Sequence, residues 1–168
     1  MLRPLFVFIL NLVLLGACLA QESSANPDDV KTIDALMDAY YESVSGPPGQ
    51  RDGERMLSLF IEGGKISIGL EGDAPTHQLA EDYLRSERFL TISEDFYEQE
   101  IGRVTQSFGN MAHVMSSYGI SDAWSNTDFR ARGVTFFQLV QHNDRWWILG
   151  TLWQRASDEN PLPPELRD

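Results

Sequence analysis

The side chains of this chain that titrate near neutral pH are those of its three histidines, His77, His113 and His142. His77 falls at the start of a predicted helix, and His142 falls at a predicted hairpin turn, where we expect it to be solvated. Only His113 falls in the middle of a predicted strand, where a side chain can line a pocket. We therefore take His113 as a candidate catalytic or ligand-binding residue. The alternative is a purely structural histidine.

Arg103 is the candidate for holding an anionic group, because a guanidinium can bind a carboxylate through two parallel hydrogen bonds. If Gly109-Asn110 forms the turn between two predicted strands, Arg103 shares a strand face with Ser116 and Tyr118. That face would combine a cation with two hydroxyl groups. A structural salt bridge between Arg103 and an acid is the alternative role.

The opposite face of the same two strands carries His113 with Glu100 and Gln106. Each face thus has one polar cluster, and the pattern leaves open which of them lines a pocket. We expect the acidic stretches 28–29 and 98–100 to be solvated surfaces. The sequence has no phosphate-binding loop, serine nucleophile elbow or dense cluster of metal ligands, so we predict neither a metal nor a cofactor.

Four further residues are candidates for contacts with a ligand. Tyr40 and Tyr41 lie on the first predicted helix, and Trp153 lies on the last predicted strand. Gln138 lies among apolar neighbours and needs a hydrogen-bond partner if it is buried. Ordinary packing in the core or in a dimer is the alternative role for the aromatic residues.

Capping residues and apolar spacing predict three helices that position these side chains. The first begins after Asn26 and ends at 45–49, the second is capped by Asp52 and ends at 63–64, and the third is capped by Thr76. Alternating apolar residues predict a strand over 65–70 between the second and third helices.

Four long strands follow, over 96–107, 111–120, 132–141 and 146–155. With Asn143-Asp144 as the last turn, Val140 faces Trp147, Gln138 faces Leu149 and Phe136 faces Thr151. Both faces of this hairpin are apolar, whereas a sheet with one wet face should alternate apolar and polar residues. We therefore expect α+β architecture, with helices on one face of a curved antiparallel sheet. A homodimer partner or the C-terminal tail would cover the other face.

Residues 1–20 are typical of a secretory signal segment. A basic start precedes an apolar run over 5–15, which is shorter than the roughly 20 residues that a membrane span needs. Cleavage before Gln21 would release a soluble protein. The residues up to Cys18 also resemble a lipobox, which would leave a lipid anchor on Cys18. Both outcomes stay open, with a slight preference for the soluble form, and both predict export to the periplasm or beyond.

Cys18 is the only cysteine, so the predicted mature domain has no internal disulfide and no cysteine-based zinc site. The formal net charge is −12, which argues against nucleic acid as a partner because phosphate contacts need clustered Lys and Arg. We expect contact with a membrane only if Cys18 is lipidated.

The ordered segments DALMDAYYESVSG, ERMLSLFIEGGKISI, YEQEIGRVTQSFGNMAHVMSSY and GVTFFQLVQHNDRWWILGTLWQ resemble the nuclear transport factor 2-like superfamily, of the SnoaL-like (polyketide cyclase) type. Exported bacterial members without a known activity are the most similar. The resemblance implies a cone-shaped sheet packed against three helices, a pocket between sheet and helices, and often a dimer through the outer sheet face. Members include isomerases, dehydratases, epoxide hydrolases, polyketide cyclases and many binding domains.

The motifs of the enzymatic members are incomplete in this chain. Tyr40 or Tyr41 could match the tyrosine of isomerase-like members, but the strand 65–70 lacks the carboxylate base. The histidine pair of scytalone dehydratase-like members is missing, and Arg103, Glu100 and Asp122 cannot be matched to the Asp-Arg-Asp set of epoxide hydrolase-like members.

We therefore expect a signal segment over 1–20, a short polar linker over 21–27, one domain over 28–156 and a proline-rich tail over 157–168. The first functional hypothesis is an exported domain that binds a small apolar or mixed-polarity molecule. The alternatives are a lyase, isomerase or hydrolase that uses His113 or Arg103 with a tyrosine, and a non-catalytic dimeric interaction module.

Overall fold

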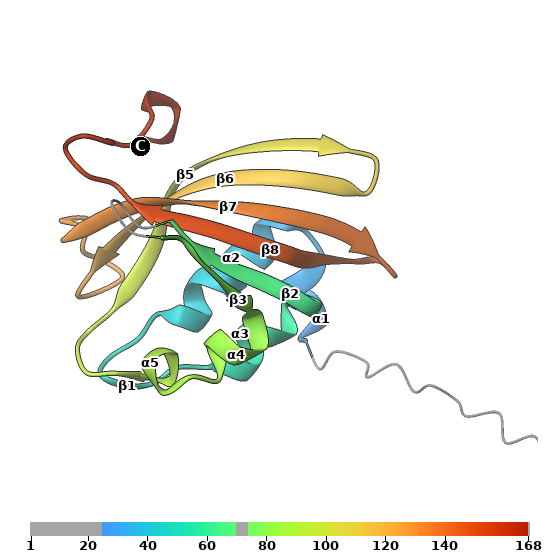
Figure 1. Cartoon of the computed structure of the whole chain (residues 1–168), viewed down its shortest axis with the longest axis horizontal. Coiled ribbons are helices and arrows are strands. Elements are labelled where there is room, and N and C mark those ends of the chain that lie inside the picture. The colour runs from blue at the N-terminus through green and yellow to red at the C-terminus, as the bar shows by residue number, and fades with distance from the viewer. Residues whose placement is uncertain (1–24, 70–73, 168) are drawn as a thin grey trace, which may run out of the picture.

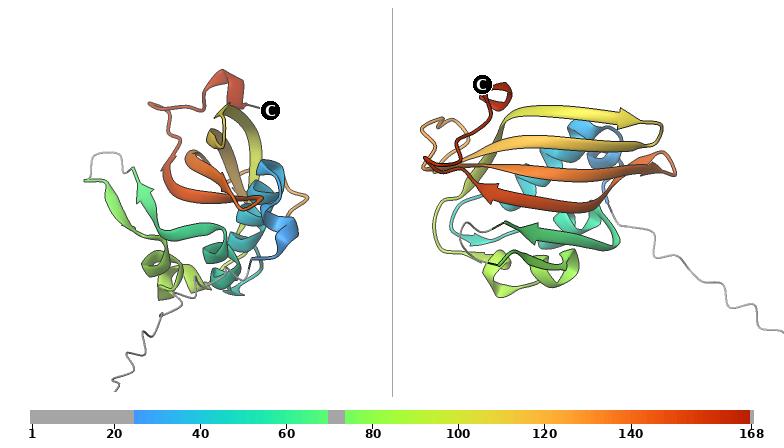
Figure 2. Two further views of the ribbon diagram at one scale, coloured as in Figure 1. Left: turned by 90° about the vertical axis from the view of Figure 1, so that its right-hand side faces the viewer. Right: turned by 45° about the horizontal axis from the view of Figure 1, so that its top comes forward.

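A six-stranded sheet in the order β3-β2-β8-β7-β6-β5 forms one layer of the computed structural model, and the helices gather on one side of it (Figure 1). Two turned views show that the sheet curves around the helical side (Figure 2). The structure describes residues 25–69 and 74–167. The predicted signal segment, Cys18 and most of the predicted linker lie outside the described residues.

The N-terminal helical region is two helices rather than the one expected. Asn26 caps α1 (Pro27–Val30) as predicted, and Thr32 then caps a second helix, α2 (Ile33–Val44), by accepting a hydrogen bond from the backbone N–H of Ala35. The buried face of α2 includes Tyr40 and Tyr41, which the apolar spacing had placed inward.

The helix that was predicted as the second is α3 (Gly53–Ser58), and it has the predicted cap at Asp52. The chain enters β2 (Phe60–Ile68) earlier than expected, through an irregular stretch that includes Gly63 at φ +76°. The pairing of β2 with β8 is parallel, so the sheet is mixed rather than purely antiparallel.

The prediction that Thr76 caps a helix is wrong. Thr76 begins β3 (Thr76–Leu79), which pairs antiparallel with β2 and places Thr76 opposite Ile68. The helical residues follow as α4 (Ala80–Leu84) and α5 (Glu87–Leu90). A two-stranded ribbon of β1 (Gly49–Gln50) and β4 (Thr91–Ile92) ties the loop after α2 to the chain leaving α5.

The four long strands form two hairpins, as the sequence predicts. They are β5 (Tyr97–Phe108), β6 (Met111–Ser121), β7 (Ala131–His142) and β8 (Arg145–Arg155). Gly109 lies in the first turn at φ +59°, and Asn143 and Asp144 form the second with φ of 51° and 58°. Positive φ at both central residues is the signature of a tight turn that matches strand twist.

A β-bulge in each hairpin changes the register from the one expected. In the second hairpin Val140 does face Trp147. A register shift between Gln138 and Leu139 then pairs Gln138 with Gly150 and Phe136 with Leu152. A one-residue slip moves a side chain to the other face of a sheet. Trp153 therefore pairs with Thr135 on the inner face, opposite to the face of Gln138.

The bulge in the first hairpin lies between Glu100 and Gly102. Arg103 faces Ser116 as predicted, but Glu100 pairs with Tyr118 and Glu98 with Ile120. The extra residue, Ile101, thereby turns both glutamates toward the helices.

The C-terminal tail is partly ordered by the outer face of the sheet. It ends in a short helical turn, η1 (Pro164–Leu166), in which Leu166 is fully buried. The Ser117 hydroxyl donates a hydrogen bond to the carbonyl oxygen of Leu166 at 2.7 Å. The tail thus covers part of the outer face beside β5 and β6. No helix within 25–69 and 74–167 is long and apolar enough to cross a membrane.

Candidate functional site

A cavity of about 180 Å³ lies between the inner face of the sheet and the helices. Its walls come from the helices α2, α3, α4 and α5 and from the strands β2, β4, β5, β6, β7 and β8. Aromatic side chains dominate the lining: Tyr40, Tyr83, Phe89, Phe96, Tyr118 and Trp153. The cavity is therefore largely apolar with a few polar groups, which is the usual composition of a small-molecule site.

Glu98 supplies the carboxyl group of the cavity. Its backbone is fixed by Ser45 at the C-terminal end of α2, because the Ser45 hydroxyl accepts from the Glu98 N–H at 2.9 Å and donates to the Glu98 carbonyl oxygen at 3.2 Å. Within the described part of the chain, no side-chain hydrogen bond or ion pair of the Glu98 carboxyl is found. The carboxyl therefore keeps its hydrogen-bonding capacity for an occupant of the cavity.

Burial raises the pKa of Glu98 to about 7, because a desolvated carboxyl disfavours its charged form. The positive charge of Arg155 acts in the opposite direction but does not cancel this effect. Arg155 and Arg88 both line the cavity and are both exposed, so their side chains lie at its mouth. At neutral pH, Glu98 can therefore both release and accept a proton.

Four tyrosines surround this carboxyl. Burial raises the pKa of Tyr40, Tyr41, Tyr83 and Tyr118, and the negative charge of Glu98 raises each further. The four phenols thus stay protonated at physiological pH and can act as hydrogen-bond donors. Tyr40 is held edge-on against Phe137 with ring centroids 4.9 Å apart.

Tyr118 owes its position to a glycine on the neighbouring strand. Gly133 pairs with Tyr118, and a Cβ atom at Gly133 would lie 2.3 Å from the Tyr118 hydroxyl oxygen and 2.4 Å from the adjacent ring carbon. Only a residue without a side chain lets the phenol lie over β7 and reach the cavity.

Arg103, Ser116 and Tyr41 are brought together, but beside the cavity rather than as its lining. The Tyr41 hydroxyl lies 2.7 Å from the Ser116 hydroxyl, which donates to Glu100 at 2.5 Å. Arg103 then bridges Glu100 at 2.8 Å and the exposed Asp34 at 2.9 Å. Arg103 is therefore engaged in salt bridges, which was the alternative role weighed for it. The expectation that Glu100 shares a face with His113 is wrong, because of the bulge at Ile101.

His113 and Gln138 lie on the outer face of the sheet and do not line the cavity. Both are exposed, they pair with each other in register, and the His113 ring stacks on Phe136 at 5.5 Å between centroids. Of the residues proposed from the sequence as ligand contacts, Tyr40, Tyr118 and Trp153 line the cavity.

Sequence reasoning missed Glu98, as it missed Tyr83, Arg88 and Arg155, because the acidic stretch 98–100 is expected from the sequence to be a solvated surface. Without a bulge, the turn at 109–110 would put Glu98 on the same face as His113. The available signal was Gly102, because a glycine inside a strand often marks a bulge.

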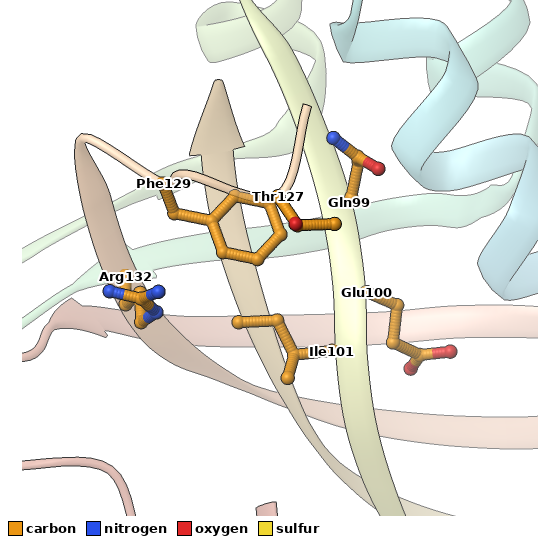
Figure 3. A pocket seen from close by; sticks show the side chains of 6 residues that line it. All are labelled: Gln99, Glu100, Ile101, Thr127, Phe129 and Arg132. Atoms are coloured by element: carbon orange, nitrogen blue, oxygen red, sulfur yellow. The ribbon is translucent and has the colours of Figure 1, made fainter. Parts of the chain in front are cut away.

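A second recess lies outside the helical layer, next to the loop between β6 and β7. Ile101, Thr127, Phe129 and Arg132 gather on one side of β5, whereas Glu100 points away to the other side (Figure 3). The Arg132 guanidinium lies 5.2 Å from the centre of the Phe129 ring. The recess is open to solvent and holds no free carboxyl or phenol, so we treat the enclosed cavity as the candidate site.

No group of three or more His, Cys, Asp or Glu residues placed to hold a metal ion is found in the described ranges. The cavity itself presents a carboxyl, phenols, an indole and guanidinium groups that can take part in chemistry.

No protein-family model matches the sequence, and a search of curated proteins finds no match. Solved structures do resemble the chain. A nuclear transport factor 2-like protein of unknown function from Shewanella baltica has a TM-score of 0.53 and 12% identity over 73% of this chain and 90% of its own.

Two further structures carry provisional enzyme descriptions. One is described provisionally as a dehydratase of the nuclear transport factor 2-like family from Streptomyces avermitilis, with a TM-score of 0.57 and 17% identity over 79% of this chain and 99% of its own. The other is described provisionally as a scytalone dehydratase from Novosphingobium aromaticivorans, with a TM-score of 0.57 and 14% identity over 74% and 82%. At such identities the likeness concerns the fold alone: the chain has the nuclear transport factor 2-like fold.

Proposed function

We propose that this domain binds a small organic molecule in the cavity between sheet and helices. The observation that carries the proposal is an aromatic cavity containing a carboxyl group for which residues 25–69 and 74–167 supply no hydrogen-bond or ion-pair partner. An engineered apolar cavity of about 150 Å³ is known to hold benzene. A volume of about 180 Å³ therefore suits a ligand of one ring or of similar bulk.

A cavity-filling substitution tests this proposal. Val44 lines the cavity, so Val44→Trp should fill it and abolish binding. Val134 alternates with buried neighbours on β7 and faces outward, so Val134→Trp is the matched control. Phenol and cyclohexanol serve as probes in titration calorimetry. Binding to the native protein and to V134W but not to V44W supports the proposal. Equal binding to all three proteins would place the probes elsewhere and contradict it.

An enzyme that transfers a proton is the second candidate, and the pKa of Glu98 near 7 favours it. Glu98 would remove a proton next to a carbonyl group, and a cavity phenol such as that of Tyr118 would donate a hydrogen bond to the developing oxyanion. Deuterium incorporation at the α-carbon of cyclohexanone in D₂O, followed by NMR, measures this reaction directly. Glu98→Gln should abolish the protein-dependent exchange, and exchange that persists in this variant would contradict the role.

The proposal also places the domain outside the cytoplasm. Its support is the basic start, short apolar run and small residues of 1–20, which lie outside the described residues. The intact mass of protein recovered from the producing cells distinguishes the three possible N-termini: uncleaved Met1, free Gln21, or lipidated Cys18. Recovery of the uncleaved chain alone would contradict export.

A further inference from the structure

The lining of the cavity suggests which charge its ligand carries, an inference that rests on the proposed binding function. We propose that the ligand is a small organic cation whose ammonium group sits against Glu98 and the aromatic rings. A carboxylate that is partly removed from water without a direct ion-pair partner is unfavourable, so the ammonium group of a ligand would supply that partner. Glu98 lines the cavity, and no ion pair of its carboxyl is found in the described part of the chain.

The aromatic walls favour the same class of ligand. A cation is attracted to the face of an aromatic ring, most strongly to tryptophan, and quaternary ammonium groups are commonly bound among several rings. Trp153, Tyr40, Tyr83 and Tyr118 line the cavity on different sides, from β8, α2, α4 and β6. The rings and the carboxyl thus come from five different elements, β5 included, and converge on one space.

The net charge of the molecule acts in the same direction. The formal net charge of −12 gives a negative potential that attracts cations and repels anions over the surface. The positive charges of Arg88 and Arg155 at the mouth of the cavity oppose this potential, and Arg155 is near enough to lower the pKa of Glu98. Both arginines are exposed to solvent, which screens their charge, whereas Glu98 is half-buried in the cavity wall, and burial raises its pKa.

Binding of a cation beside Glu98 should depend on pH. The groups that face Glu98 are Tyr40 and Tyr41 from α2, Tyr83 from α4, Arg88 from α5, Tyr118 from β6 and Arg155 from β8. The phenols and guanidinium groups keep their protonation state between pH 5 and 8, so Glu98 is the group among them that titrates there. Cation binding should therefore strengthen as pH rises through 7.

Two probes of the same shape separate charge from bulk. Choline and 3,3-dimethylbutan-1-ol differ by a quaternary nitrogen in place of a quaternary carbon. At pH 8, titration calorimetry should show choline binding at least about tenfold more tightly than the alcohol, a difference in the range of one desolvated cation–π contact. Lowering the pH from 8 to 5 should weaken choline binding and leave the alcohol unchanged.

Glu98→Gln keeps the shape of the side chain and removes its charge. It should lower the affinity for choline about tenfold, abolish its pH dependence, and leave the affinity for the alcohol within about twofold. Glu94→Gln, an exposed neighbour at the entry to the same sheet, is the matched control and should change neither. Trp153→Leu is a second variant, which should weaken choline more than the alcohol.

The outcomes separate this inference from the binding proposal. Equal affinities for choline and the alcohol would overturn the cation inference while leaving small-molecule binding intact. Tighter binding of 3,3-dimethylbutyrate than of choline would overturn it in favour of an anion held by the two arginines. Failure of all these probes, of phenol and of cyclohexanol would contradict both.

Discussion

At the scale of single residues, Glu98 makes the stability of the fold depend on pH. Its folded pKa of about 7 lies above the usual glutamate value near 4.3, so the folded state binds a proton more tightly than the unfolded state. The contribution of Glu98 to stability is then most favourable at low pH, falls as pH rises from about 4 to 7, and is constant above that range. The penalty at pH 8 is at most about 4 kcal/mol on these two values.

Replacing the carboxyl removes this penalty. We predict that Glu98→Gln is more stable than the native protein by about 1–3 kcal/mol at pH 8, and of similar stability at pH 4.5. Urea unfolding at the two pH values, followed by tryptophan fluorescence, measures the difference. A native-like pH dependence in the variant would mean that Glu98 is not the titrating group. A gain in stability on loss of a side chain is also typical of a functional residue.

Gly133 is a second single residue on which the cavity depends. We predict that Gly133→Ala destabilises the fold by about 1–3 kcal/mol, because its Cβ would overlap the Tyr118 ring and push it from the cavity. Gly150 on β8 is the matched control, since a Cβ there would lie 3.4 Å from the nearest atom. Urea unfolding of both variants tests this, and a cost for Gly150→Ala as large as for Gly133→Ala would contradict it.

How far the sequence predicts this site depends on the backbone around each residue. Tyr40 lies in a regular helix, and apolar spacing places it toward the core, whereas alternation puts Tyr118 on a strand face without deciding whether that face lines the cavity. Trp153 and Glu98 lie beyond bulges, each of which reverses the side of the sheet that the residue faces. A bulge depends on how one strand fits its partner, so the sequence of one strand alone predicts the position of the bulge only weakly.

At the scale of elements, the C-terminal end of α2 depends on Arg51. Arg51 is 4% exposed, and its guanidinium donates to the carbonyl oxygens of Val44, Gly46 and Pro47 at 2.8, 2.9 and 2.7 Å. These carbonyls lie at and after the end of the helix, beyond its intrahelical hydrogen bonds, and that of Gly46 also accepts from the backbone N–H of Phe96 at 3.0 Å. Arg51 thus fixes the loop that leads from α2 toward α3, next to the Ser45 that holds Glu98.

We predict that Arg51→Lys destabilises the fold by about 2 kcal/mol or more. An ammonium is a compact donor and cannot reach three carbonyls in the geometry of a guanidinium, so part-buried carbonyl oxygens lose hydrogen bonds. Arg85→Lys is the control, because Arg85 pairs with Glu54 and Glu81 at the exposed surface, where ion pairs contribute little. Guanidinium chloride unfolding compares the two. Equal effects would mean that the Arg51 bonds do not stabilise the end of α2.

The elements that local signals define were predicted, and those that the sheet edge defines were not. The Asn143-Asp144 turn and the cap at Asp52 are set by a few adjacent residues. The short strand β3 was predicted as helix, because Thr76 suits a helix cap. Its pairing with the edge of β2 is a contact between segments, which takes precedence over the local preference.

At the scale of the whole molecule, the outer face of the sheet is only partly covered by its own chain. Leu166 and Leu162 of the tail are buried, yet Phe136, Leu149 and Leu152 on β7 and β8 are 37%, 39% and 46% exposed. Contiguous apolar side chains on a sheet face are typical of an interaction surface. The tail therefore covers the outer face of the sheet beside β5 and β6 only, and it leaves the outer face of β7 and β8 uncovered.

We predict that a second copy of the chain covers the remainder, because a face of this kind can pair with itself about a twofold axis. Light scattering of the mature domain at micromolar concentration should give about twice the protomer mass. Leu152→Lys should give the protomer mass, because a charge cannot be buried there without a partner.

Leu79→Lys, at a residue that is 36% exposed on β3, should leave the mass doubled. If the native domain is monomeric at these concentrations, the exposed residues of β7 and β8 serve another partner or none. Since the cavity lies on the helical side of the sheet, loss of the dimer in the Leu152→Lys protein should leave the affinity for choline unchanged.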